Sequence, residues 1–532
     1  MTDRRLVRGP GKPGRDDAQG TSQPAHTAAA EVTDEAQPHR ASRSLSSAVG
    51  RSTLWAVATN ITMRVASVAV TALLARLLSK EAFGVFAIAL AVYLVVSSLA
   101  ELGMGSAIAR SAAEPEDIAP TVASISIIVS TVLGLAMALG APLLAAALGQ
   151  PDAAGPLRVL SLCLVLTGVF AVPGAQLVRE FRQDRVFAGS IIGFLVSNPL
   201  LVVLALHGGG AESFAWSRVA GQLATGLVFV FSTSRRYRPG WRRSVLLPLI
   251  RFGVPLSVAN LVNWTLLNAD YMILGRLVDA ALVGVYTIAF NVANWSTAVL
   301  GSVLNSVVLP AFGRVGGDPE RMRAALASAS TLVALLALPV GAMTLVLAHP
   351  LVITVFGQKW SDAAPVLSVL SLYGILYAFS LLFVNVLVAT GSTLRLLVIQ
   401  IAWVATLVPA IVLGLHLRGL EGVAWAHVLT IGLVAVPAYL VAIRRATGHR
   451  LAPLLRTAGR PAAAAAVAAL GAFFSSRAVE ASWSSLIVGG LVGGVIYVAG
   501  AGPVVVQHLP ARLVPAWLPS RWRPAPAAAG EA

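Results

Sequence analysis

Long apolar segments alternate with short polar stretches along most of the chain. A helix needs about 20 mostly apolar residues to cross a bilayer, and about 14 segments of the sequence approach that length. Their centres lie near residues 66, 97, 133, 167, 197, 224, 262, 295, 337, 377, 406, 433, 468 and 495. The connecting stretches are too short to hold a soluble catalytic domain. The pattern predicts an all-α polytopic membrane protein with about 14 transmembrane helices.

The polar stretches also divide the chain into expected regions. Residues 1–50 are rich in Gly, Pro, Ala and Arg and lack the apolar core of a signal peptide, so we expect a disordered cytoplasmic tail. The other expected regions are a six-helix bundle at 51–235, a basic cytoplasmic linker at 236–250, a second six-helix bundle at 251–445, two additional transmembrane helices at 446–508 and a disordered cytoplasmic tail at 509–532.

Two segments of the chain are repeated at similar spacing. Leu74–Ala89 (LARLLSKEAFGVFAIA) matches Leu274–Ala289 (LGRLVDAALVGVYTIA), and Asp152–Leu162 (DAAGPLRVLSL) matches Asp362–Leu372 (DAAPVLSVLSL). Arg, Gly and Asp stay in register, which a shared apolar composition would not produce. An even number of helices separates the copies, so both halves have the same orientation. We therefore expect two parallel six-helix repeats around a central cavity, as in transporters, followed by two C-terminal helices.

The composition agrees with a membrane protein, and the charge indicates its orientation. Hydrophobic residues make up 57% of the chain and charged residues 12%, which excludes a string of ordinary soluble domains. The net charge of +16 comes from Lys and Arg in short clusters between apolar segments, so it does not indicate nucleic-acid binding. Most of these residues fall in the two tails and in alternate loops, whereas Arg218 is among the few in the opposite loops. By the positive-inside rule, both termini face the cytoplasm.

The sequence lacks the usual signs of catalysis. Its one cysteine, Cys163, lies in an apolar segment, and His207, His349, His416 and His427 show no metal-ligand spacing. No glycine-rich phosphate loop follows a strand. We expect no metal, no cofactor and no catalytic residue, and therefore a transporter in place of an enzyme.

Polar and aromatic side chains gather on faces of repeat-equivalent helices, as a shared cavity requires. The candidate substrate-binding residues are Asn60, Arg64, Asn260, Asn263, Trp264, Asn291, Asn294, Trp295, Tyr373 and Tyr377. Arg64 lies deep in its helix, where a guanidinium offers a fixed fork to a phosphate or diphosphate. Asn and aromatic side chains suit sugar hydroxyls and sugar rings. Glu101 and Asp270 are candidates for ion coupling.

Each of these assignments has a structural alternative. Arg64 could pair with Glu101 and only join two helices. The Asn residues could form interhelical hydrogen bonds. Asp270 could be a carboxylate at the membrane interface, because it lies near the predicted outer end of its helix.

Three segments, ALLARLLSKEAFGVFAIAL (Ala72–Leu90), ELGMGSAIAR (Glu101–Arg110) and RFGVPLSVANLVNWTLLNADYMILGRLV (Arg251–Val278), resemble the Wzx-type polysaccharide flippases. That family belongs to the multidrug/oligosaccharidyl-lipid/polysaccharide (MOP) superfamily, which includes the MATE transporters. The resemblance spans about Thr53 to Arg445. The resemblance implies export of an undecaprenyl-diphosphate-linked oligosaccharide across the bacterial cytoplasmic membrane for cell-surface polysaccharide, by alternating access. It also implies a cationic cavity, with Arg64 matching an arginine of the first helix, and neighbours among polysaccharide polymerase and export proteins.

Other functions remain open at this point. An ion-coupled multidrug antiporter of the same superfamily would usually have acidic cavity residues, whereas the deepest expected charge here is Arg64. A lipid II flippase agrees with fourteen helices, since many polysaccharide flippases have twelve. A membrane-bound polymerase or glycosyltransferase would need a large outward loop, and a channel would not need polar stripes on both halves.

Overall fold

A computed structural model describes residues 66–100, 115–180, 182–303, 319–447 and 452–508, apart from some side chains within the helices. The chain divides into a unit of residues 1–67 and a unit of residues 68–532. The first unit is outside the described residues except for its last two, so the predicted tail at 1–50 is not seen. All contacts below lie within the second unit.

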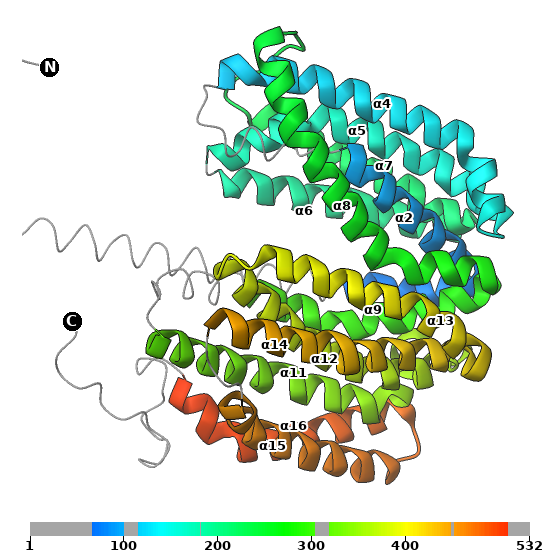
Figure 1. The fold of residues 1–532 in the computed structure, drawn as a ribbon. Helices are drawn as coiled ribbons and strands as arrows, with labels where there is room; N and C mark the ends of the chain where they lie inside the picture. Colours follow the sequence, from blue (N-terminus) through cyan, green and yellow to red (C-terminus); the bar gives the residue numbers. More distant parts are fainter. Residues whose placement is uncertain (1–65, 101–114, 181, 304–318, 448–451, 509–532) are drawn as a thin grey trace, which may run out of the picture. The chain divides into compact units, whose positions relative to one another are not determined.

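The described chain is helical, which confirms the predicted fold class. After a helix at Ala66–Leu77, the helices are α2 (Lys80–Ala100), α4 (Pro115–Ala147), α5 (Ala154–Arg179), α6 (Gln183–Leu206), α7 (Gly210–Ser232), α8 (Arg243–Leu277), α9 (Ala280–Val303), α11 (Pro319–Phe356), α12 (Ala363–Ala389), α13 (Thr393–Thr430), α14 (Val436–Thr447), α15 (Ala452–Arg477) and α16 (Ser482–His508) (Figure 1). Short 3-10 turns lie at Pro151–Ala153 and Gln358–Trp360, and a π-helical turn at Ile431–Ala435 precedes α14. Within the described residues, 10 helices are long and apolar enough to cross a membrane, and none of the residues forms a strand. The count of 14 stays a prediction.

Helix α13 is two helices joined by a sharp reversal. Arg418 and Gly419 leave the helical conformation, and Gly419 has a φ of 59°, which favours glycine. Beyond the turn the chain folds back closely, because a Cβ on Gly414 would lie 2.3 Å from the carbonyl oxygen of Gly422. The apolar segments expected near residues 406 and 433 are therefore separate helices.

The two C-terminal helices form a hairpin on α11. Helices α15 and α16 pack against each other and against α11 (Figure 1). Leu335 of α11 is buried with Ala464 and Ala501, and the Tyr497 hydroxyl donates to the Leu335 carbonyl at 2.9 Å. The segment expected as two additional helices therefore packs on the second repeat.

The duplicated segments meet where α2 crosses α9. A Cβ on Gly84 would lie 1.7 Å from the Ala280 carbonyl oxygen, and a Cβ on Gly284 would lie 2.0 Å from the Lys80 carbonyl oxygen. Residues 80 and 280 occupy the same place in the repeat, as do 84 and 284. Gly84 of the first repeat therefore packs against residue 280 of the second, and Gly284 of the second packs against residue 80 of the first. This reciprocal contact is the mark of an approximate two-fold axis between the halves.

A second reciprocal contact closes one end of the two halves. The Trp360 Nε1 donates to the Ala75 carbonyl at 2.7 Å, and the Gln150 Nε2 donates to the Gly275 carbonyl at 3.2 Å. Residues 150 and 360 are equivalent in the second repeated segment, as 75 and 275 are in the first. Lys80 adds an ion pair with Asp362 at 2.7 Å. We call these contacts the end clamp.

The stretch before α8 is attached to the first repeat. Arg235 and Arg242 pair with Glu116 and Asp117 at the start of α4. Helix α8 begins at Arg243, within the region expected as a linker at 236–250. The linker is therefore shorter than the sequence indicated, and its first half is held by α4.

Candidate functional site

A cavity of about 470 Å³ lies within the second repeat, and we call it the C-cavity. Helices α8, α9, α12, α13 and α14 line it with Leu267, Asp270, Phe290, Asn294, Tyr373, Tyr377, Ser380, Leu381, Val384, Gln400, Trp403, Val404, Leu407, His427 and Tyr439. The 3.6-residue helical period explains the face that α12 presents, because Tyr373, Tyr377 and Ser380 are spaced by four and three residues. The structure thus brings together four predicted residues, namely Asp270, Asn294, Tyr373 and Tyr377.

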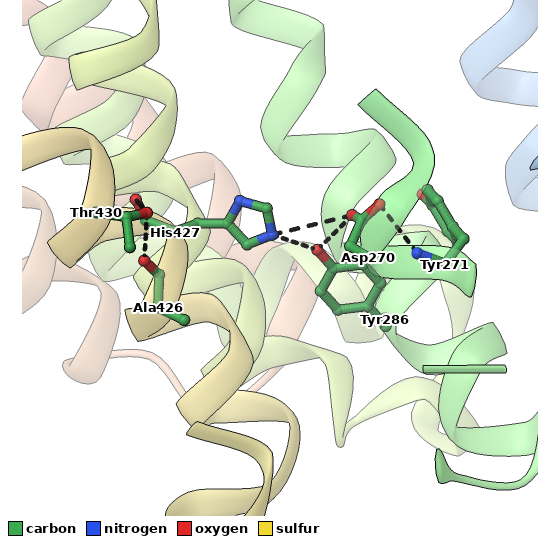
Figure 2. Close-up of polar contacts among 6 residues, drawn as sticks. All are labelled: Asp270, Tyr271, Tyr286, Ala426, His427 and Thr430. Carbon is green, nitrogen blue, oxygen red and sulfur yellow. Dashed lines mark hydrogen bonds and ion pairs between the residues drawn. The ribbon is translucent and has the colours of Figure 1, made fainter. Parts of the chain in front are cut away.

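A buried hydrogen-bond network forms the polar wall of the C-cavity. The Tyr286 hydroxyl donates to Asp270 Oδ2 at 2.8 Å and lies 3.1 Å from His427 Nε2 (Figure 2). The Tyr271 backbone N–H donates to the other Asp270 oxygen at 2.9 Å. Since the tyrosine proton bonds to Asp270, a hydrogen bond to His427 requires that Nε2 carry the proton. The network then runs from His427 through Tyr286 to Asp270.

Asp270 and His427 lie in the interior. Their side chains are 4% and 5% exposed, and Asp270 Oδ2 lies 3.9 Å from His427 Nε2. Asp270 is therefore enclosed by the protein and not exposed at its surface. A buried carboxylate in a membrane helix is costly and usually serves a function, and it can take up a proton or hold a cation.

Aromatic rings form the rest of the wall and leave polar groups available. Tyr373 stacks on Tyr377 with ring centroids 5.5 Å apart, and its edge meets the His427 ring at 5.1 Å. Trp403 Nε1 and His427 Nδ1 are buried without a hydrogen-bond partner among the described residues. Buried polar groups are normally satisfied, so a bound ligand or water is the natural partner for both. Such a wall suits a ligand with flat faces and several oxygens.

The structure does not group the remaining predicted residues with this site. Asn260, Trp264 and Asn291 are outside the cavity lining, and Asn291 is exposed. The side chains of Asn263 and Trp295, and all of Asn60, Arg64 and Glu101, lie outside the described residues. Their roles stay predictions.

The polar and aromatic lining residues that were not predicted from the sequence include Phe290, Gln400, Trp403, His427 and Tyr439. Metal-ligand spacing does not reveal His427, because a hydrogen-bonded histidine needs no such spacing. A further repeated segment in the sequence includes His427. Ala215–Val219 (AWSRV) matches Ala424–Val428 (AWAHV) at an offset of 209 residues.

Solved structures with a similar fold are membrane transporters. The chain aligns with the lipid II flippase MurJ in an inward closed conformation at a TM-score of 0.69 and 13% identity, covering 85% of this chain and 98% of that one. It aligns with an inward-facing MATE multidrug resistance transporter of the MOP superfamily at a TM-score of 0.60 and 20% identity, covering 74% and 96%. At these identities the comparison establishes the fold alone.

Sequence relatives come from polysaccharide biosynthesis. The lipopolysaccharide biosynthesis protein WzxC of Escherichia coli is 25% identical over 404 residues, covering 74% of this chain and 80% of its own. The succinoglycan biosynthesis transport protein ExoT of Rhizobium meliloti is 30% identical over 307 residues, covering 56% and 61%. The family described as polysaccharide biosynthesis protein matches residues 73–365, more than half of the chain. This protein is therefore a multi-pass membrane protein that belongs to the polysaccharide biosynthesis protein family.

Proposed function

We propose that this protein moves an undecaprenyl-diphosphate-linked oligosaccharide from the inner to the outer leaflet of the bacterial cytoplasmic membrane. Its membership of the polysaccharide biosynthesis protein family is the observation on which the proposal rests. WzxC and ExoT, by their names, serve lipopolysaccharide and succinoglycan biosynthesis. The glycan headgroup passes between the two repeats while the lipid tail stays in the bilayer. Both termini face the cytoplasm, and a polysaccharide polymerase and export proteins act on the product. No reaction is catalysed on the substrate.

The reciprocal contacts between the halves support alternating access. The end clamp joins loops that the positive-inside rule assigns to the outer face. These bonds are polar and can be exchanged for bonds to water as the two repeats rock about the crossing of α2 and α9. The described conformation is then closed to the outside, and opening of the clamp releases the headgroup.

The network of the C-cavity is suited to coupling this motion to an ion. Asp270, Tyr286 and His427 come from three helices of the second repeat, so a charge change at Asp270 alters contacts among all three. We propose that Asp270 takes up a proton or a cation during each cycle, and that Asn294, Tyr373 and Tyr377 contact the sugars. Glu101, outside the described residues, stays a second candidate for coupling.

Depletion of the protein tests the function in cells. We expect one undecaprenyl-diphosphate oligosaccharide to accumulate several-fold, because an assembled unit that cannot cross is not consumed outside. Mass spectrometry of extracted lipid-linked glycans measures this pool, and re-expression of the wild-type gene should restore it. An unchanged pool would refute the proposal.

The MATE fold and the buried Asp270 favour one second candidate, an ion-coupled drug antiporter. That function predicts unchanged lipid-linked glycans and higher sensitivity to cationic dyes in depleted cells. Accumulation of lipid II, with the other lipid-linked glycans unchanged, would instead assign a lipid II flippase. The same extracts therefore separate all three transport functions.

A further inference from the structure

The first repeat contains a second cavity, which we call the N-cavity. Its volume is about 570 Å³, and helices α2, α6 and α7 line it with Phe86, Tyr93, Ser190, Gly193, Phe194, Ser197, Leu201, Phe214, Ser217, Arg218, Gly221, Gln222 and Thr225. None of the residues predicted from the sequence as a binding site is among them.

The N-cavity is the counterpart of the C-cavity in the duplicated fold. Four residues of α6 line the N-cavity at positions 190, 193, 194 and 197, and four residues of α13 line the C-cavity 210 positions later, at 400, 403, 404 and 407. The repeated segments AWSRV and AWAHV place Arg218 in the position that His427 holds in the other half. The two cavities are therefore built on the same framework, with different chemistry at equivalent positions.

Charge is the main difference between the two cavities. Asp270 of the C-cavity has Val70 at the equivalent position of the first repeat. In the N-cavity the one charged lining side chain, among the described residues, is Arg218. The duplicated fold thus has an acidic group in one half and a basic group in the other.

Arg218 lies within the membrane-spanning part of α7. It follows the first residue of the helix, Gly210, by eight positions, or about 12 Å along the axis. Its placement in a loop from the charge pattern was therefore wrong. Its guanidinium carbon lies 5.2 Å from the centroid of the Tyr93 ring, and no ion pair between described residues includes it. An arginine at this depth usually faces a wet cavity and binds an anionic group.

The other polar groups of the N-cavity are arranged as hydrogen-bond acceptors. The Gln222 amide nitrogen donates to the Cys163 carbonyl at 3.0 Å and to Thr167 Oγ1 at 2.8 Å, whereas no described residue donates to its oxygen. Ser190, Ser197, Ser217 and Thr225 donate their hydroxyl protons to backbone carbonyls. Ser197 Oγ also accepts from the Asn198 side-chain amide at 3.4 Å. The remaining oxygen lone pairs are available to hydroxyl donors of a ligand.

Aromatic rings supply a flat wall beside these groups. Phe86 and Phe214 are stacked with centroids 4.7 Å apart, and Phe194 lines the same cavity. Rings of this kind cover the apolar faces of a sugar, while the hydroxyl and amide oxygens accept from its edges. A cation, several acceptors and aromatic faces together describe a site for an acidic, hydroxylated ligand.

We propose that the N-cavity is a glycan-binding site in which Arg218 holds an anionic group, a sugar carboxylate or a phosphate, of the lipid-linked substrate. The ligand class rests on the proposed function. Arg218 binds the anion through its guanidinium fork, and Gln222 accepts from a neighbouring sugar hydroxyl. The first repeat then recognises the charged headgroup, while the second repeat couples its passage to an ion.

Binding to the full-length protein in nanodiscs tests this site directly. The probes are cellobiouronic acid, cellobiose as its neutral counterpart, and undecaprenyl diphosphate. Ligand-detected NMR measures the two sugars, and native mass spectrometry measures the lipid. Arg218→Gln removes the charge and keeps a polar side chain. Arg158→Gln is the matched control. Arg158 is also an exposed arginine in a helix, but it lies outside the cavity lining. Equal thermal stability of the variants checks their folding.

We expect Arg218→Gln to weaken binding of an acidic probe about tenfold, as loss of a charge-assisted hydrogen-bond pair does, and Arg158→Gln to leave it unchanged. Loss for cellobiouronic acid assigns the site to a sugar carboxylate, and loss for undecaprenyl diphosphate assigns it to the lipid phosphate. Unchanged binding of both acidic probes, or the same loss for cellobiose, would overturn the proposal. Glycan accumulation on depletion is a separate result, so the transport function and this site can fail independently.

Discussion

Replacing Asp270 by Asn will reduce glycan export at least about tenfold while the protein remains folded in the membrane. Asn matches Asp in shape. Its single oxygen can accept from the Tyr271 backbone, and its NH2 group can donate to the Tyr286 hydroxyl, which then donates to His427, so the change removes mainly the charge and the group that takes up a proton. A site that must alternate between charged and neutral forms cannot do so with an amide. Export is measured as the lipid-linked glycan pool in depleted cells that express the variant.

Asp279→Asn is the matched control for this prediction. Asp279 is exposed and accepts a hydrogen bond from the Leu282 backbone at the start of α9, a capping role that Asn also fills. We expect normal export from this variant, and a partial loss from Tyr286→Phe, which removes the bridge between Asp270 and His427. Normal export by Asp270→Asn would show that Asp270 is structural and that coupling occurs elsewhere.

Gly84→Val will destabilise the protein by about 1–3 kcal/mol or more, the usual cost of overpacking. The new Cβ would overlap the Ala280 carbonyl, which lies 1.7 Å from its ideal position, and the backbone of a crossing helix cannot move aside as a side chain can. Close helix crossings in membranes depend on small residues for this reason. Survival of monodisperse protein after heating in detergent, judged by gel filtration, measures the loss.

Gly140→Ala tests whether the effect belongs to the crossing. Gly140 is also in a membrane-spanning helix, but its Cβ would meet nothing within 4 Å. Alanine also favours helix more than glycine does, so this variant should be as stable as the wild type or slightly more stable. If Gly84→Val and Gly140→Ala were equally stable, the halves would not meet closely at Gly84 and the approximate two-fold axis would lose its main support.

The fold could be predicted from the sequence because its signals are local. Apolar segments mark helices, and the match of Gly84 with Gly284 is visible without coordinates. The structural role of these two glycines cannot be read from the sequence. Gly84 contacts residue 280 and Gly284 contacts residue 80 only because α2 and α9 cross at these positions. The start of α8 was expected too late because a run of arginines leads up to Arg243, and this charge was interpreted as a linker.

The site could be predicted only in part, because it depends on contacts between distant segments. The helical spacing of Tyr373 and Tyr377 predicts that both lie on one face of their helix, and both line the C-cavity. The burial of Asp270 depends on Tyr286 and on His427, which lies on a helix more than 150 residues away, so this burial cannot be read from the position of Asp270 near a helix end. Arg218 was assigned to a loop because charge was interpreted as a loop signal, although α7 begins at Gly210 and continues to Ser232.

The leaflet location of the lipid-linked glycan tests the central claim most directly. Spheroplasts of depleted cells are treated with a membrane-impermeant glycosidase or periodate, and the protected share of the undecaprenyl-diphosphate oligosaccharide is measured by mass spectrometry. If this protein moves the headgroup across the membrane, the protected share will rise on depletion and fall when wild-type protein is restored. An accessible share that stays the same with and without the protein would contradict the account.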